Sequence, residues 1–169
     1  HLDHLQPLHI DAFCRDVNAV EADVVLLGGD IAVARNIREI LRMLDDAIAA
    51  PIHFVLGNHD YYGAGIDRTR ARVAEFTRAS RRPTWLPTAG VVQLTPDTAL
   101  IGHGSWADGR FGDYERYDLM LNDYRLIDDF IRLDRPERLA KLNALGDEAA
   151  AYLRDVLEDA VRVSRRVIL

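Results

Sequence analysis

Two short apolar segments of this chain each end in glycine and then present polar side chains. The first reads VVLLGGD and ends at Asp30, and the second reads FVLGNHD and ends in Asn58, His59 and Asp60. Buried strands of α/β proteins have such continuous apolar runs, and ligands bind these proteins beyond the carboxyl ends of the strands. The two segments therefore predict strands whose ends present oxygen and nitrogen donors.

Short apolar runs alternate with helical patterns over the rest of the chain, which is typical of an α/β protein. We expect five strands, at residues 23–28, 52–56, 91–94, 98–102 and 166–169. We expect one helix over about residues 33–49, stopped by Pro51, and another over about residues 136–163, weakened or broken at Gly146. The length of 169 residues, 49% of them hydrophobic, predicts a single domain over residues 1–169.

The charge balance and the cysteine content limit which classes of protein and which cellular locations are expected for this chain. The chain has 21 Lys and Arg against 27 Asp and Glu, a net charge of −6, which argues against a protein that coats nucleic acid. The single cysteine, Cys14, cannot close an intramolecular disulfide, which favours a reducing compartment and a cytoplasmic location. No run approaches the ~18 apolar residues of a membrane span, and the N-terminus has no signal pattern, so we expect no membrane partner.

Each polar group after a strand also has an ordinary structural explanation. An Asp in this place is commonly a helix N-cap or a turn former, and Asn-His-Asp could form a polar turn. The joint pattern is more informative, because adjacent strand ends in one sheet lie only ~5 Å apart. Asp30 offers a carboxylate that can bridge two cations, Asn58 an amide oxygen, and His59 an imidazole suited to transition metals. Together these residues predict a metal site.

GGD at residues 28–30 and GNHD at residues 57–60 resemble the second and third signature blocks of the calcineurin-like metallophosphoesterases. The family's pattern opens with Asp-x-His, and HLDHLQP at the start of this chain resembles the continuation of such a block, with His1 as its histidine. The alternative for His1 is a tag remnant or a frayed terminus. RRVIL, at the other end, stops where the family continues into further histidine blocks. The resemblance implies a calcineurin-like αββα sandwich that is incomplete at both ends.

The resemblance also implies a site with two divalent metal ions, which could be Mn, Fe, Zn or Ni, with Mn favoured. Asp30 would bridge the two ions, Asn58 would complete the shell of the second, and His1 would help hold the first. His59 would be the catalytic residue that faces the substrate phosphate, and Asp60 would orient its ring. The implied activity is hydrolysis of phosphate mono- or diesters with metal-bound hydroxide as the nucleophile. The alternative is a catalytically silent scaffold that binds a protein partner.

The segment at residues 102–125 is a candidate substrate-binding loop because it follows a strand and mixes aromatic with charged residues. Its aromatic residues after the strand are Trp106, Phe111, Tyr114 and Tyr117. Trp106 could stack on a base or sugar, Arg110 could pair with phosphate, and His103 could line the site. The alternative is a partly buried connector with a structural role for His103. The Arg-rich stretch at residues 68–82 could meet a phosphate-rich partner, although a solvated helix face is the commoner outcome.

Overall fold

The computed structural model describes residues 1–116 and 118–169, so that Tyr117, one of the aromatic residues of the candidate loop, lies outside the described residues. The first sheet has the order β1-β2-β3, with β1 at Val25–Leu27, β2 at Ile52–Phe54 and β3 at Pro83–Trp85. All three strands are parallel, with Val25 opposite Ile52 and Ile52 opposite Pro83. The polar residues after β1 and β2 therefore meet at one edge of this sheet, as the sequence predicts.

The second sheet has the order β4-β5-β6, with β4 at Val92–Thr95, β5 at Thr98–Leu100 and β6 at Arg166–Ile168. β4 and β5 are antiparallel, whereas β5 and β6 are parallel. The five expected strands correspond to β1, β2, β4, β5 and β6. β3 is an additional strand whose three residues, beginning with a proline, are too few to show a strand period.

The helices are η1 (Leu2–His4), α1 (Pro7–Ala19), α2 (Ile37–Ala47), η2 (His59–Tyr61), α3 (Ile66–Ala79), α4 (Leu86–Ala89), α5 (Asp123–Leu126) and α6 (Arg135–Val163). The expected helix at residues 33–49 is α2, which starts later and ends before Pro51. Most of the Arg-rich stretch lies in α3, so it is helical. No helix within residues 1–116 and 118–169 is long and apolar enough to cross a membrane.

α6 runs unbroken through Gly146, contrary to the expected weakening at that position. The residue is small because a Cβ there would lie 3.0 Å from Asp108 Oδ2, where the loop after β5 crosses the helix. The start of α6 is fixed by a capping box, in which Asp134 and Glu137 each accept a hydrogen bond from the other's backbone N–H. The cost of an internal glycine, about 1 kcal/mol, does not break a helix that is capped and packed in this way.

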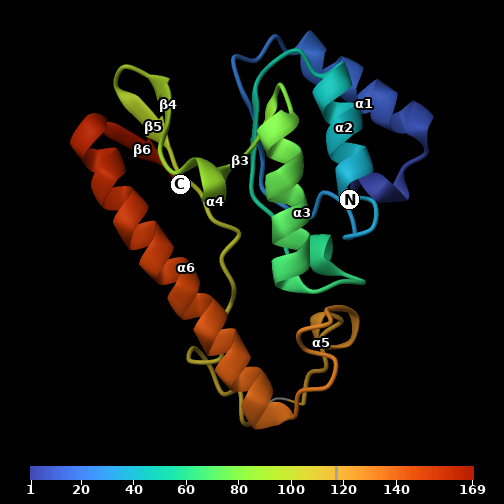
Figure 1. Cartoon of the computed structure of the whole chain (residues 1–169), viewed down its shortest axis with the longest axis vertical. Coiled ribbons are helices and arrows are strands. Elements are labelled where there is room, and N and C mark those ends of the chain that lie inside the picture. The colour runs from blue at the N-terminus through green and yellow to red at the C-terminus, as the bar shows by residue number, and fades with distance from the viewer. Residues whose placement is uncertain (117) are drawn as a thin grey trace.

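The elements form helix, sheet, sheet and helix layers, consistent with the expected α/β sandwich. α1, α2 and α3 lie on one side of the molecule and α6 on the other, with the two sheets between them (Figure 1). The main hydrophobic core lies between the first sheet and its helices and includes Ile37, Leu41, Leu44, Phe54 and Phe130. The second sheet has a small core of its own, formed by Ala99, Ile101 and Ala160.

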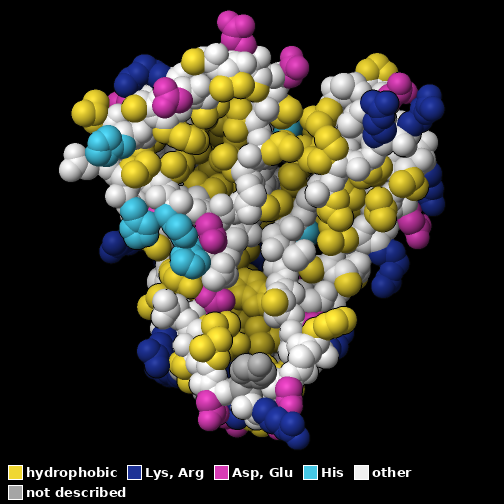
Figure 2. Space-filling model, turned by 180° about the vertical axis from the view of Figure 1, so that it is seen from behind, with side chains coloured by type: hydrophobic (Ala, Val, Ile, Leu, Met, Phe, Trp, Pro, Cys, Tyr) yellow, Lys and Arg dark blue, Asp and Glu magenta, His cyan; other side chains and the backbone are white. Residues whose placement is uncertain are grey.

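A cavity of about 400 Å³ separates the two sheets. Its apolar lining comes from β1, β5 and β6, through Leu26, Leu100 and Ile168, and the imidazole of His53 on β2 also borders it. Figure 2 shows apolar side chains gathered around the hollow between the two sheets. This space lies between the two sheets and reaches the end of β1 at Gly28.

Candidate metal centre

Two glycines allow the loops after β1 and β2 to approach each other closely. Gly29 has φ of 96°, and a Cβ on it would lie 2.9 Å from the Cα of Gly57. A Cβ on Gly57 would lie 2.7 Å from the backbone nitrogen of Asp30 and would collide with its carboxylate. Side chains at these positions would push the two loops apart. The glycines of the two motifs therefore create the close contact on which the site depends.

The carboxylate of Asp60 joins the same two loops. It is fully buried, and it accepts hydrogen bonds of 2.8 Å from the backbone N–H groups of Ile31, Ala32 and Gly57. Burial raises the pKa of Asp60 to about 6, and these three backbone donors oppose the shift by favouring the carboxylate. Asp60 thus connects the loop after β1 to the loop after β2.

The expectation that Asp60 orients the ring of His59 is wrong in this structure. Both oxygens of its carboxylate bond to backbone N–H groups instead. The short helix η2 buries Asp60 in the protein interior while it leaves its neighbour His59 partly exposed. His59 is held by another ring, since Tyr62 stacks on it with centroids 4.4 Å apart and an angle of 24° between the planes.

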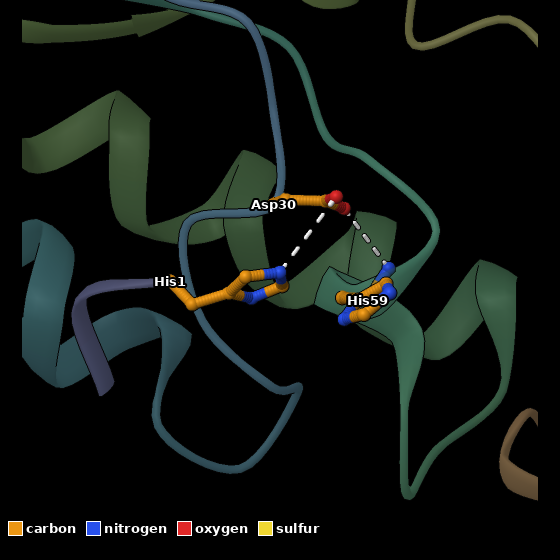
Figure 3. A group of neighbouring side chains, drawn as sticks. All are labelled: His1, Asp30 and His59. Carbon is orange, nitrogen blue, oxygen red and sulfur yellow. Dashed lines mark hydrogen bonds and ion pairs between the residues drawn. The ribbon is translucent and has the colours of Figure 1, made fainter. Parts of the chain in front are cut away.

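Asp30, His1 and His59 bring a carboxylate and two imidazoles together (Figure 3). One ligand atom from each lies within 4.8 Å of the others. Asp30 Oδ1 accepts a hydrogen bond from the backbone N–H of His59 at 3.2 Å, and Oδ2 lies 3.9 Å from His1 Nε2. Asp30 has φ of 53°, a left-handed conformation that is uncommon for residues other than glycine. This donor set has the chemistry of a transition-metal site, so the residues present fit a divalent cation.

Asn58 lies beside this group and is held by residues that sequence analysis did not identify. Its amide nitrogen donates to Asp123 Oδ1 at 2.8 Å, and the hydroxyl of Tyr62 donates to the same oxygen at 2.7 Å. Tyr62 follows the GNHD motif closely, so its position could have marked it as a candidate. Asp123 is 65 residues from Asn58, and no local pattern connects the two.

A cavity of about 320 Å³ opens at these strand ends. It is lined by residues of the two motif loops, by a short segment of the loop after β5 and by Asp123: Gly28, Asp30, Gly57, Asn58, Gly104, Ser105, Trp106, Ala107 and Asp123. The segment after β5 lies against the loop after β2, because a Cβ on Gly104 would collide with the carbonyl oxygen of Leu56. The cavity therefore joins the donor side chains to the loop expected to bind substrate.

Of the three expected substrate-binding residues, the structure brings only Trp106 to this cavity. Trp106 is braced by Tyr61 and Phe130, with ring centroids 5.8 and 5.7 Å away. His103 borders the cavity between the sheets instead, where it accepts a hydrogen bond from the backbone N–H of Ser105, and burial lowers its pKa.

Arg110 lies against α6 rather than at the cavity of the strand ends. Its guanidinium pairs with Asp147 at 2.7 Å and with Asp108 at 3.3 Å. It also donates to the backbone carbonyl oxygen of Asn143 at 2.8 Å. These contacts attach the loop after β5 to α6. In this structure the Arg110 side chain therefore makes structural contacts and does not line the cavity of the strand ends.

Comparison with known proteins identifies the family to which the chain belongs. A family model described as calcineurin-like phosphoesterase matches residues 4–155. This range contains Asp30, Asn58, His59 and Asp123. No curated protein and no solved structure matches the chain.

Proposed function

Since this chain belongs to the calcineurin-like phosphoesterase family, we propose that it hydrolyses phosphate mono- or diesters at the carboxyl ends of β1 and β2. One observation carries the proposal: Asp30, His1 and His59 present ligand atoms within 4.8 Å of one another. These residues come from three separate parts of the chain. Their convergence at the strand ends, where α/β proteins bind ligands, supports a catalytic rather than a purely structural role.

We propose that the site holds two divalent metal ions, with Mn favoured among Mn, Fe, Zn and Ni. Asp30 would hold both ions with its carboxylate, Asn58 would supply its amide oxygen, and His1 would supply a ring nitrogen. Such ions, when bound, neutralise charge on the phosphoryl oxygens and lower the pKa of water so that hydroxide is available near neutral pH. A mixed set of carboxylate, amide and imidazole ligands suits these metals.

His59 is the proposed catalytic residue. Hydrolysis adds the oxygen of water to phosphorus, breaks the bond from phosphorus to the ester oxygen, and leaves an alcohol that must gain a proton. A protonated imidazole of His59 can give that proton to the leaving oxygen. The stacked ring of Tyr62 limits the positions of the imidazole. Trp106 lines the wall of the cavity and would contact the rest of the substrate.

We also propose a binding partner and a cellular location for the protein. The partner is a phosphate-ester substrate that reaches the cavity of the strand ends. Cys14 is a free, buried thiol, which is compatible with a reducing compartment, and we propose the cytoplasm.

The test combines metal content with turnover. Elemental analysis should find bound metal, and Mn²⁺ should stimulate hydrolysis of p-nitrophenyl phosphate or bis(p-nitrophenyl) phosphate. His59→Ala should lower turnover ~10²–10⁴-fold while it leaves metal content nearly unchanged, as expected for loss of a proton donor. His9→Ala, which removes an exposed imidazole on α1, is the matched control and should retain turnover.

The outcomes separate the candidate functions. Unchanged turnover in His59→Ala would remove His59 from the mechanism. A protein with neither bound metal nor turnover would instead be a scaffold on this fold. The ratio of monoester to diester hydrolysis identifies the preferred class of substrate.

A further inference from the structure

We propose that Asp123 is a positioning residue, which holds the Asn58 side chain with its amide oxygen available to a metal ion, an inference that rests on the proposed function. Asp123 Oδ1 accepts hydrogen bonds from the Asn58 amide nitrogen at 2.8 Å and from the Tyr62 hydroxyl at 2.7 Å. All three side chains are partly buried at this point. Asp123 and Asn58 also line the same cavity as Asp30.

The chemistry of the carboxylate fixes the direction of the amide. An ionised carboxylate only accepts hydrogen bonds, so the Asn58 nitrogen, which only donates, must be the atom that faces it. The amide oxygen is then turned away from Asp123. Within residues 1–116 and 118–169 this oxygen accepts no hydrogen bond. A neutral oxygen held in this way is a suitable ligand for a hard or borderline divalent cation.

The backbone around Asp123 is itself held against the GNHD loop. The N–H of Gly63 donates to the carbonyl oxygen of Leu126 at 2.7 Å, and the N–H of Asp128 donates to Ala64 at 3.1 Å. Ile127 is fully buried close to these bonds. Asp123 therefore lies on a segment whose position is fixed by the same loop that carries Asn58.

Tyr62 connects this interaction to His59. Its hydroxyl donates to Asp123, while its ring stacks on the His59 imidazole. One tyrosine thus contacts the residue that positions the proposed metal ligand and also the proposed proton donor. Tyr62→Phe removes the hydroxyl and keeps the ring, which allows the two contacts to be tested separately.

The experiment measures Mn²⁺ affinity directly, by the electron paramagnetic resonance signal of free Mn²⁺ during titration of the protein. Asp123→Ala should weaken binding ~10–100-fold, the usual effect of removing a group that orients a metal ligand. Asp123→Asn keeps one acceptor oxygen and should recover most of that loss. Asp128→Ala, which removes an exposed carboxylate from the same segment, is the matched control and should bind Mn²⁺ as the wild type does.

A double-mutant cycle tests whether Asp123 affects Mn²⁺ binding through Asn58. If Asp123 acts through Asn58, the double variant Asp123→Ala with Asn58→Ala should lose no more affinity than Asn58→Ala alone. Additive losses would overturn the inference, as would wild-type affinity in Asp123→Ala. Absence of Mn²⁺ binding to the wild-type protein would overturn the proposed function together with this inference. Thermal unfolding of each variant shows whether the fold is retained.

Discussion

The two sheets each have three strands, but the packing around them differs. Every residue of β2 in the first sheet is buried, whereas β6 in the second sheet has exposed residues at both of its ends. The main core packs against the first sheet, while the core of the second sheet consists of Ala99, Ile101 and Ala160. The proposed chemistry lies at the end of the better-packed sheet. Placement of catalytic groups to within a fraction of an ångström requires such support.

The loops at the two sheets differ in the same way. Asp60 joins the loops after β1 and β2 through three backbone hydrogen bonds to its buried carboxylate. In the second sheet, the turn between β4 and β5 contains Asp97, whose side chain is exposed. A carboxylate therefore has a different role in each region. Asp60 connects two loops in the protein interior, whereas Asp97 is exposed to solvent.

The same substitution in the two sheets should have very different effects on stability. Ile52→Ala in β2 empties a fully buried position and should lower the free energy of unfolding by about 2–5 kcal/mol. Ile168→Ala in β6, where the side chain is 41% exposed, should cost less than about 1 kcal/mol. Denaturant unfolding measures both. Equal losses would show that the second sheet is packed as firmly as the first.

Removal of the Asp60 carboxylate should be the next largest effect. Asp60→Ala leaves three backbone donors without their partner. Each unsatisfied buried group costs ~1–3 kcal/mol, and water can replace part of the lost bonding. We therefore expect the free energy of unfolding to fall by about 2–4 kcal/mol. Asp97→Ala is the control in the second sheet and should change stability by less than about 0.5 kcal/mol. A stable Asp60→Ala variant would mean that the two loops are held by other contacts.

Gly57→Ala should disturb the site more than the fold. The new Cβ would collide with the carboxylate of Asp30, and we expect a loss of about 1–3 kcal/mol in stability with turnover reduced ~10²-fold. Gly28→Ala, in the other motif loop, is the comparison and should lose less turnover, because a Cβ there meets nothing within 4 Å. Hydrolysis of p-nitrophenyl phosphate by the two variants compares them directly. Equal turnover would contradict the close approach of the loops.

The smallest expected effect is on the pH dependence of stability. It arises from His53, which borders the cavity between the sheets. His53 is only 8% exposed, its Nδ1 has no hydrogen-bond partner within the described residues, and burial lowers its pKa. Below its ordinary pKa of ~6.5 the unfolded chain binds a proton that the folded protein resists, so stability should fall as pH decreases. At higher pH both states are neutral and the penalty disappears.

His53→Gln should therefore flatten the dependence of unfolding free energy on pH between 7.5 and 5.5, relative to the wild type. His4→Gln, at an exposed position on η1, should retain the wild-type slope. The contribution of His103, whose pKa is also lowered, is present in all three proteins and cancels in the comparison. Identical slopes in the wild type and His53→Gln would show that the imidazole of His53 is solvated.

The parts of the fold that could be predicted have strong local patterns. β1 and β2 are apolar runs that end in glycine, and α2 has an apolar stripe, so all three were expected. α1 was not expected, although Ile10, Phe13, Cys14 and Val17 have helical spacing and contribute to the main core. Its other residues are mostly polar, and this weakened the pattern. β3 has only three residues and shows no pattern at all.

The site was predictable only as far as its residues follow a strand directly. Asp30, Asn58 and His59 were expected for that reason, and the structure brings them to one edge of the first sheet. The partners of Asp60 are almost 30 residues away at Ile31 and Ala32, so its connecting role depends on tertiary contacts. Asp123 reaches Asn58 from 65 residues away. Local periodicity contains no information about such pairs.

The most direct test of the proposed metal centre is anomalous diffraction from crystals of the protein grown with Mn²⁺. We expect two peaks ~3.5–4 Å apart at the carboxyl ends of β1 and β2, with Asp30 between them and Asn58 bound to one. A cavity without any peak, or Mn²⁺ bound only at His1, Asp3 and His4 away from Asp30, would contradict it.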